Sequence, residues 1–225
     1  MNPATETLAA RLAAVRERIA RAAGSVHRDP ATITLLAVTK VFPAAAIREA
    51  FDLGLREFGE NYVQEFETKA PALADLAGGR FHFIGHLQSN KSNKAAALFQ
   101  VIQTVDSAKL ARQLNATGRR LEVMLEVKLS EEQAKSGAAP EALPEIIAAV
   151  AECPNLALTG LMTMPPWSDD AEASRPYFRR LRELAERHAL PGLSMGMSHD
   201  LETAIEEGAT CIRVGTALFG KRKKA

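Results

Sequence analysis

Lys40 is the residue in this sequence whose setting most favours chemistry. It follows an apolar, β-branched run over residues 33–39, which is typical of a buried parallel strand. Ligands bind at the carboxyl end of such strands in both barrels and open sheets. An amine held there can lose part of its hydration, so that its pKa falls and it can attack a carbonyl carbon. The alternative is a lysine at the rim of the core whose ammonium simply reaches water.

Two loops near the end of the chain carry residues suited to holding an anion. Ser198 is the predicted N-cap of a helix over residues 198–207, and Gly215 and Thr216 follow the last predicted strand. Phosphate sites in barrels often lie after the seventh and eighth strands. Ordinary helix capping and a tight turn are the alternative. Asp200, in the first turn of the predicted helix, is expected to point away from any bound anion.

A lysine nucleophile beside a phosphate site is found in two kinds of protein. One is a Schiff-base aldolase acting on a sugar phosphate, and the other holds pyridoxal 5'-phosphate (PLP) on the lysine. The sequence contains no G-x-S-x-G nucleophile elbow and no evident pair of carboxylates for glycoside hydrolysis. His86 is interpreted as a hydrogen-bonded loop residue, and Glu60 as the partner of Lys91 or Lys94 in an ion pair at the rim.

Alternating strand and helix patterns provide the scaffold for these residues. Strands are predicted at residues 32–39, 56–58, 81–84, 101–104, 121–127, 156–161, 193–195 and 211–214. Helices are predicted at residues 5–23, 44–54, 61–76, 89–98, 107–117, 140–151, 170–187 and 198–207. This alternation predicts an α/β fold, a single (β/α)8 TIM barrel with an additional N-terminal helix. An open doubly wound sheet is the alternative, but no G-x-G-x-x-G follows the first strand.

Composition indicates a globular chain with one well-buried core. The 225 residues are 47% hydrophobic and 5% aromatic, with a net charge of +1, so nothing indicates nucleic acid as a partner. Cys153 and Cys211 belong to no metal-ligand cluster and are expected to be free thiols, with Cys211 in the core. No stretch has the length and apolarity of a membrane span, and the amino terminus lacks the pattern of a secretion signal. We therefore expect a single domain over residues 1–225, located in the cytoplasm, with no metal site and no membrane partner.

Seven short motifs, spread in order over nearly the whole chain, resemble those of one family. They are AVTK (37–40), FGENY (58–62), FIGHLQSNK (83–91), KSG (135–137), GLM (160–162), SMGMS (194–198) and RVGT (213–216). On these motifs the sequence is similar to the pyridoxal phosphate homeostasis protein family. The resemblance implies the barrel fold of the alanine racemase N-terminal domain, known as PLP fold type III. His86 and His199 depart from the residues that are frequent in the family.

The resemblance implies cofactor-binding roles for eight residues. Lys40 would carry PLP as an internal aldimine, while Ser198, Gly215 and Thr216 would hold its phosphate. The remaining four would surround the ring, Asn61 beside it, Met162 and Ser194 nearby, and Arg213 facing the pyridine nitrogen. Because arginine only donates hydrogen bonds, the nitrogen facing it stays unprotonated and the ring withdraws electrons less strongly.

The resemblance also implies a binding protein without a catalytic residue. Racemases of this fold use a second base, a tyrosine from an additional domain, whereas the two tyrosines here, Tyr62 and Tyr177, are not predicted to lie in the site. We therefore expect a PLP carrier that takes part in vitamin B6 homeostasis by buffering or delivering the cofactor. A weak amino-acid racemase or another PLP enzyme, with His86 or Tyr62 as second base, is the alternative.

Delivery of PLP would add apo-enzymes that depend on PLP to the list of partners. The KSG segment that begins at Lys135 (135–137) and the basic tail at residues 221–224 are surface features that could serve such contacts. We expect the chain to be a monomer, with a dimer as the alternative.

Overall fold

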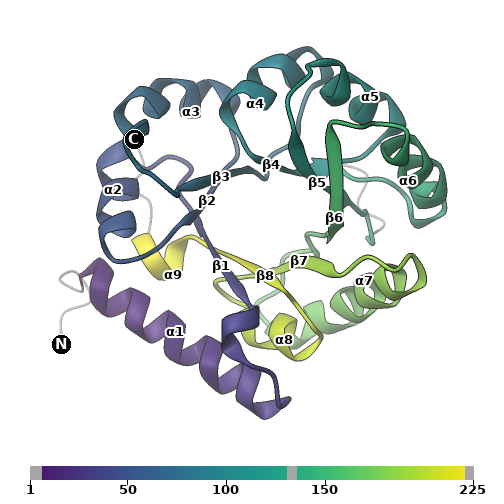
Figure 1. The fold of residues 1–225 in the computed structure, drawn as a ribbon. Helices are drawn as coiled ribbons and strands as arrows, with labels where there is room; N and C mark the ends of the chain where they lie inside the picture. Colours follow the sequence, from purple (N-terminus) through teal and green to yellow (C-terminus); the bar gives the residue numbers. More distant parts are fainter. Residues whose placement is uncertain (1–6, 131–135, 221–225) are drawn as a thin grey trace.

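A computed structural model describes residues 7–130 and 136–220 of the chain. Within them, parallel strands β1 to β8 close into one barrel in sequence order, with helices around it (Figure 1). The strands are β1 (Thr34–Val38), β2 (Glu57–Glu60), β3 (Arg80–Phe83), β4 (Val101–Val105), β5 (Leu121–Glu126), β6 (Leu156–Met162), β7 (Gly192–Met197) and β8 (Cys211–Val214). The predicted barrel and its eight strands are therefore confirmed.

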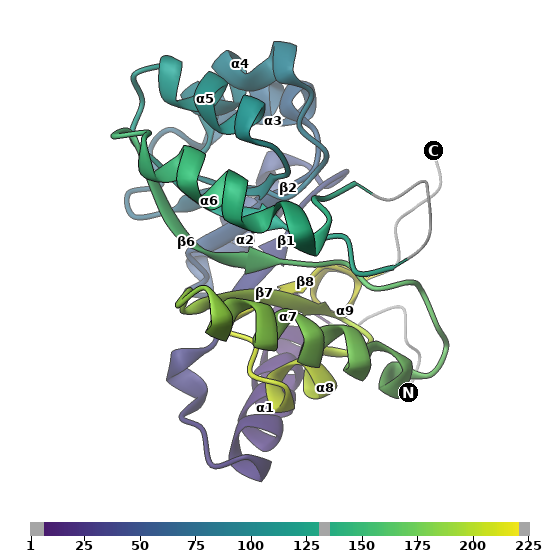
Figure 2. The same ribbon diagram turned by 90° about the vertical axis from the view of Figure 1, so that its right-hand side faces the viewer.

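Helices form the outer layer of the molecule, seen from the side in Figure 2. They are α1 (Leu8–Ser25), α2 (Ala44–Asp52), α3 (Val63–Lys69), α4 (Ser92–Leu98), α5 (Ala108–Ala116), α6 (Leu143–Ala151), α7 (Arg175–Arg187), α8 (Leu201–Glu206) and α9 (Thr216–Phe219). Three predicted helices begin with a 3-10 turn, namely η3 (Ser89–Lys91), η4 (Pro140–Ala142) and η5 (Ala171–Ser174). A further turn, η1 (Pro30–Thr32), precedes β1. The helix predicted at residues 61–76 is α3 followed by η2 (Ala70–Leu73), where Pro71 lacks the N–H that an α-helix requires.

The prediction that a helix starts at Ser198 is wrong. Helix α8 starts at Leu201, with Asp200 in the N-cap position. The Asp200 carboxylate accepts a hydrogen bond from the Met197 N–H at 2.7 Å, which closes a tight turn after β7 and delays the helix. Its other oxygen accepts from the Ser174 hydroxyl at 2.8 Å. Both oxygens of Asp200 are therefore used in holding the loop.

The additional N-terminal helix completes the wall of the barrel. In α1, Leu12, Val15 and Ile19 repeat at helical spacing and are buried, and Thr7 caps the first turn by accepting from the Ala10 N–H. This face packs against α8 and α9. The helix after β8, which the sequence did not predict, is a single turn, so α1 covers the space beside β1 that a longer helix would fill (Figure 1).

A row of phenylalanines joins the barrel to its helices on one side. Phe58 and Phe81 lie 5.6 Å apart between ring centroids, Phe81 and Phe66 lie 4.7 Å apart, and Phe66 and Phe99 lie 4.9 Å apart. Phe83 continues the row at 5.3 Å from Phe99. Aromatic pairs at such distances contribute roughly 0.5–1.5 kcal/mol each beyond the area they bury. The row fixes β2 and β3 against α3.

The barrel interior has a small apolar cluster of its own. It consists of Leu36, Val38, Ile84 and Cys211. Cys211 is therefore in the core, as predicted, and both it and Cys153 are free thiols. Among the described residues, no helix has both the length and the apolarity needed to cross a membrane.

Candidate functional site

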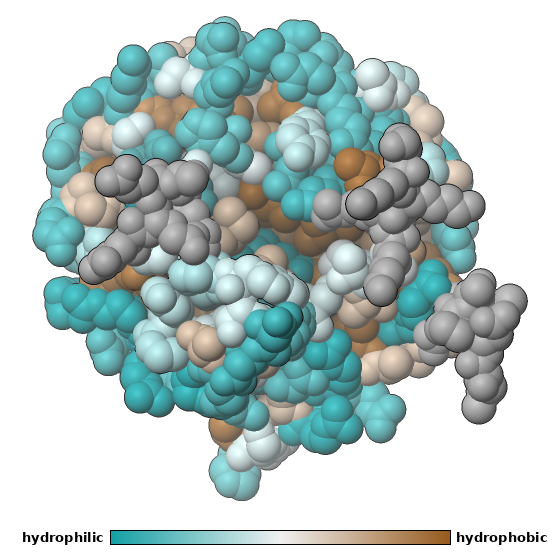
Figure 3. All heavy atoms as spheres, turned by 180° about the vertical axis from the view of Figure 1, so that it is seen from behind, coloured by the Kyte–Doolittle hydropathy of each residue, from teal (hydrophilic) through white to brown (hydrophobic). Residues whose placement is uncertain are grey.

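A cavity of about 280 Å³ lies among the loops that follow the strands. Figure 3 faces this end of the barrel and shows a central hollow with hydrophobic side chains at its base. Six of the eight residues predicted from the sequence line the cavity, namely Lys40, Asn61, Ser198, Arg213, Gly215 and Thr216. They come from the ends of β1, β2, β7 and β8, which are neighbours in the closed barrel.

The rest of the lining is largely apolar. Val38 and Ile84 come from the barrel interior, and Met164 and Trp167 come from the loop after β6. The Trp167 side chain is 71% exposed, and its ring lies 5.0 Å from the ring of His199. An apolar wall with a few convergent polar groups is typical of a small-molecule site.

Met162 and Ser194, the other two predicted residues, do not line the cavity. Both are fully buried and are paired across β6 and β7. Ser194 lies directly beneath the site, because its hydroxyl oxygen accepts a hydrogen bond from Arg213 Nη1 at 2.8 Å. Its place in the structure is therefore behind Arg213.

Arg213 is held rigidly at the base of the cavity. Besides its bond to Ser194, it donates from Nη2 to the Thr163 carbonyl at 2.8 Å, and only 4% of the residue is exposed. Burial lowers the pKa of Arg213 below its ordinary value, but a guanidinium remains charged at neutral pH. The site therefore presents a fixed cation that can only donate hydrogen bonds.

A buried ion cluster holds the backbone on both sides of Lys40. Lys69 donates from Nζ to the Thr39 carbonyl at 3.0 Å and to Glu60 Oε1 at 2.9 Å, and the Thr39 hydroxyl donates to the same carboxylate oxygen at 2.8 Å. Burial raises the pKa of Glu60, and its bonds to Lys69 and Thr39 oppose that rise. The predicted pairing of Glu60 with Lys91 or Lys94 is therefore wrong.

Val41, the residue after Lys40, has a strained backbone. Its φ of 62° is unusual for a β-branched residue. Its N–H donates to Glu65 Oε1 at 2.6 Å, and Glu65 pairs with Lys69 at 2.5 Å. The turn that presents Lys40 is therefore fixed by Lys69 and Glu65, neither of which the sequence reasoning identified. Their i, i+4 spacing on a helix after β2 was the available signal.

Two buried polar atoms at the cavity have no hydrogen-bond partner among the described residues, Asn61 Oδ1 and His199 Nε2. Asn61 is placed by its backbone, because a Cβ on Gly85 would lie 2.1 Å from the Asn61 carbonyl oxygen. Only glycine allows the ends of β2 and β3 to approach so closely. Unpaired buried polar atoms are costly, so their position beside Lys40 and Arg213 favours a polar ligand in the cavity.

The two predicted anion loops are joined to each other. The Ser198 hydroxyl accepts a hydrogen bond from the Ala217 N–H at 3.2 Å, so the loop after β7 contacts the loop after β8. Gly196 allows this arrangement with a φ of 89°, and a Cβ there would lie 2.4 Å from the Cβ of Ala204. Ser198, Gly215 and Thr216 thereby line one cavity.

Glu126 is a further ionisable residue that sequence reasoning missed. It ends β5 and is only 3% exposed. Burial raises its pKa to about 7, the negative charge of Asp106 adds to the rise, and Arg213 opposes it. Its alternation with Met124 on β5, which places both on the inner face of the barrel, was the available signal.

The remaining candidates lie apart from the cavity lining. His86 is exposed, and its Nδ1 lies 3.1 Å from the Ser136 hydroxyl. Tyr62 is 55% exposed, and Tyr177 lies on α7. Lys135 and the basic tail at residues 221–224 lie outside the described residues.

Comparison with known proteins defines the class of barrel. The family model for the alanine racemase N-terminal domain matches residues 10–223. The alanine racemase of Corynebacterium glutamicum superposes with a TM-score of 0.66 at 20% identity, covering 95% of this chain and 61% of that one, which shows a shared fold. The fold is therefore that of the alanine racemase N-terminal domain.

Full-length relatives define the family more narrowly. The pyridoxal phosphate homeostasis protein of Pseudomonas aeruginosa is 50% identical over 222 residues, covering 96% of both chains. The structure of PipY from Synechococcus elongatus with PLP bound has a TM-score of 0.83 at 39% identity, covering 95% of this chain and 100% of that one. This chain belongs to the pyridoxal phosphate homeostasis protein family.

Proposed function

We propose that this protein binds PLP covalently at Lys40 and serves to buffer its supply. The observation that carries the proposal is the single cavity in which Lys40, Arg213 and the two joined loops at Ser198 and Thr216 meet. PLP supplies an aldehyde that condenses with a primary amine, with loss of water, and a ring whose absorption reports that condensation. The match to the PLP-bound relative supports the same cofactor here.

The residues of the cavity fit the chemical groups of PLP. The hydroxyls of Ser198 and Thr216 and the backbone of Gly215 suit the phosphate. Arg213 suits the pyridine nitrogen, which accepts a hydrogen bond. Asn61 lies beside Lys40, where its amide can contact the edge of the ring.

Buffering explains these features better than racemisation does. A racemase needs a second acid–base group opposite the lysine, and Tyr62, Tyr177 and His86 do not line the cavity. The imidazole that does line it, His199, lies 5.0 Å from the ring of the exposed Trp167. Trp167 lines the cavity and is 71% exposed, so the cavity reaches the protein surface, which suits reversible loading. We propose that the bound PLP is released to apo-enzymes that require it. We also propose that residues 1–225 form one domain and that the protein acts as a monomer.

Covalent loading is tested by absorption spectroscopy. Purified protein is titrated with PLP, reduced with borohydride and mapped by peptide mass spectrometry. Lys40→Ala is compared with Lys109→Ala, which changes an exposed lysine on α5. We expect a single adduct at Lys40 in the wild type and in Lys109→Ala, and none in Lys40→Ala. Adducts scattered over surface lysines would refute the proposal.

The carrier role is tested on the loaded protein. We expect no racemisation or transamination of common amino acids at enzyme-like rates, together with recovery of activity when the loaded protein is mixed with an apo-enzyme. Turnover of an amino acid at rates of about 1 per second or more would instead identify an enzyme. Light scattering of the eluted protein would test the monomer.

A further inference from the structure

A chain of hydrogen bonds crosses the inside of the barrel beneath the proposed cofactor site. Arg213 on β8 donates to Ser194 on β7 at 2.8 Å, and Ser194 donates to Gln103 Oε1 on β4 at 2.6 Å. Gln103 Nε2 then lies 2.9 Å from His82 Nδ1 on β3, and His82 Nε2 contacts Glu57 Oε2 on β2. All but Glu57 are at least nine-tenths buried. Aliphatic side chains usually fill such barrels, so this polar chain requires an explanation.

The residues at the two ends of this hydrogen-bond chain allow only one direction of hydrogen-bond donation along it. Arg213 can only donate, so the Ser194 oxygen accepts and its proton points to Gln103. At the other end, burial works against the charge of Glu57, but its bonds from His82 and Arg80 outweigh burial and hold its pKa below the usual 4.5. Glu57 is therefore an ionised carboxylate that can only accept.

The links between the ends are then fixed one by one. With Oε1 of Gln103 facing Ser194, its amide N–H faces His82, so His82 Nδ1 carries no proton. The ring proton then lies on Nε2 and is donated to Glu57. Reversing any one of these hydrogen bonds would leave two buried donors, or two buried acceptors, facing each other. The mismatch would be passed along the hydrogen-bonded residues as far as Arg213.

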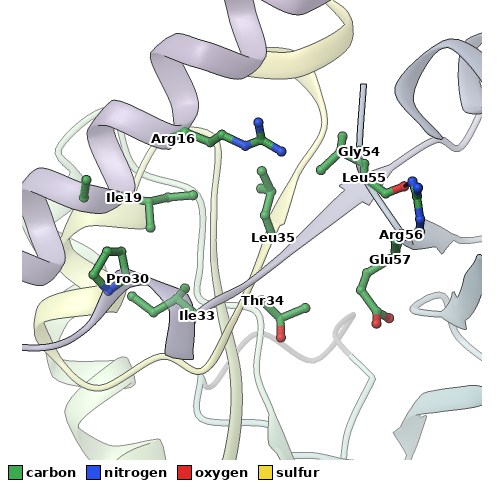
Figure 4. A pocket seen from close by; sticks show the side chains of 11 residues that line it. Arg16, Ile19, Pro30, Ile33, Thr34, Leu35, Gly54, Leu55, Arg56 and Glu57 are labelled. Atoms are coloured by element: carbon green, nitrogen blue, oxygen red, sulfur yellow. Dashed lines mark hydrogen bonds between the residues drawn. The ribbon is translucent and has the colours of Figure 1, made fainter. Parts of the chain in front are cut away.

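Glu57, at the far end of the hydrogen-bond chain, reaches the opposite side of the barrel. The Glu57 side chain is 22% exposed, against 8% for His82. It borders a cavity of about 480 Å³ between α1, β1 and β2, where it lies near Thr34 (Figure 4). Arg80 holds it there at 3.5 Å while pairing with Glu122 at 2.8 Å. The hydrogen-bond chain therefore connects Arg213 to the ionised Glu57 carboxylate at the other mouth of the barrel.

We propose that Ser194, Gln103 and His82 are positioning residues that orient the Arg213 guanidinium toward the cofactor. This inference rests on the proposed function, because it assigns to Arg213 the contact with the PLP ring. Two guanidinium nitrogens are committed to Ser194 and Thr163, which leaves the remaining N–H groups to face the cavity in one orientation. Fixing that orientation before binding lowers the cost of ordering it on binding.

The test separates the donor order from cofactor binding. Imidazole nitrogen NMR of the protein without PLP reports the His82 tautomer, with His82→Asn assigning the signal among the five histidines. We expect the proton on Nε2 in the wild type. In Gln103→Glu, whose carboxylate cannot donate, we expect Nδ1 to carry a proton as well as Nε2, because carboxylates then face both ring nitrogens. Gln64→Glu, on the exposed face of α3, introduces the same charge and should leave His82 unchanged.

The second readout is PLP affinity from the absorption titration. We expect Gln103→Glu and Ser194→Ala to bind PLP on the order of tenfold more weakly, the effect of leaving one buried hydrogen-bonding group unpaired. Borohydride should still fix the cofactor on Lys40, and thermal unfolding confirms that each variant is folded. Unchanged affinity and absorption in both variants, or Nδ1–H in the wild type, would overturn the inference while leaving the proposed function standing. Failure of the wild type to take up PLP would instead refute the proposed function and the inference with it.

Discussion

Glu126 offers a sharp test of the electrostatics at the barrel mouth. It is almost fully buried at the end of β5, and its pKa is raised from 4.5 to about 7, chiefly by burial. Each pKa unit corresponds to about 1.4 kcal/mol, so ionising this carboxyl costs about 3 kcal/mol more in the folded protein than in the unfolded chain. Replacement by the neutral, similarly sized glutamine removes that cost.

The sign of the effect follows from proton binding. Between pH 4.5 and about 7 the folded state binds more protons at Glu126 than the unfolded state does, so stability falls as the pH rises. Below pH 4.5 both states are protonated and the contribution of Glu126 to stability is fully present. Glu126→Gln should therefore match the wild type in stability near pH 4.5 and exceed it by about 2–3 kcal/mol at pH 8.

Urea unfolding of the protein without PLP, measured between pH 5 and pH 8, provides the free energies. A gain of this size corresponds to a rise in Tm of about 4–12 °C for a domain of this length. Glu145→Gln, an exposed carboxylate on α6, is the matched control and should change stability by less than about 0.5 kcal/mol. A stability difference that is constant over the pH range, or a variant that is less stable at pH 8, would refute the reasoning.

Three further predictions concern the scaffold of the site. Lys69→Met leaves the Glu60 carboxylate buried without its cation, so we expect a loss of about 3–5 kcal/mol in urea unfolding and weaker PLP uptake; unchanged uptake would argue against the ion cluster as a support for the site. Gly160→Ala would place a Cβ 2.1 Å from the Gly192 carbonyl oxygen, so we expect at least about 1–3 kcal/mol of destabilisation by thermal unfolding, and a neutral result would contradict the close approach of β6 and β7. Phe66→Ala removes the centre of the phenylalanine row and should cost about 3–5 kcal/mol in urea unfolding, whereas a loss below about 1 kcal/mol would show that the row is dispensable.

The sequence was informative about the site because a parallel barrel brings strand ends together. Once eight strands are recognised from their periodicity, every residue that follows a strand must lie at the same end of the barrel. This rule alone places Lys40, Ser198 and Thr216 near one another, although they are far apart in the chain. It does not settle which side chains at that end face the cavity.

Local signals also misplaced some details. A serine before an apolar run predicted that a helix starts at Ser198, but the Asp200 carboxylate closes the turn and the helix starts at Leu201. Met162 and Ser194, which the resemblance places near the ring, are fully buried and do not line the cavity. Which residues of a strand line the cavity depends on how the strands are staggered around the barrel, and no single segment specifies that stagger.

What the sequence by itself determined is therefore the order of strands, the end of the barrel that carries polar residues, and the lysine among them. What only the tertiary structure decided is which polar groups meet. Ser194 and Gln103, hydrogen-bonded at 2.6 Å, are 91 residues apart and come from strands on different sides of the barrel. The physical reason is that periodicity is a property of one segment, whereas a contact between segments exists only once the closed barrel fixes their register.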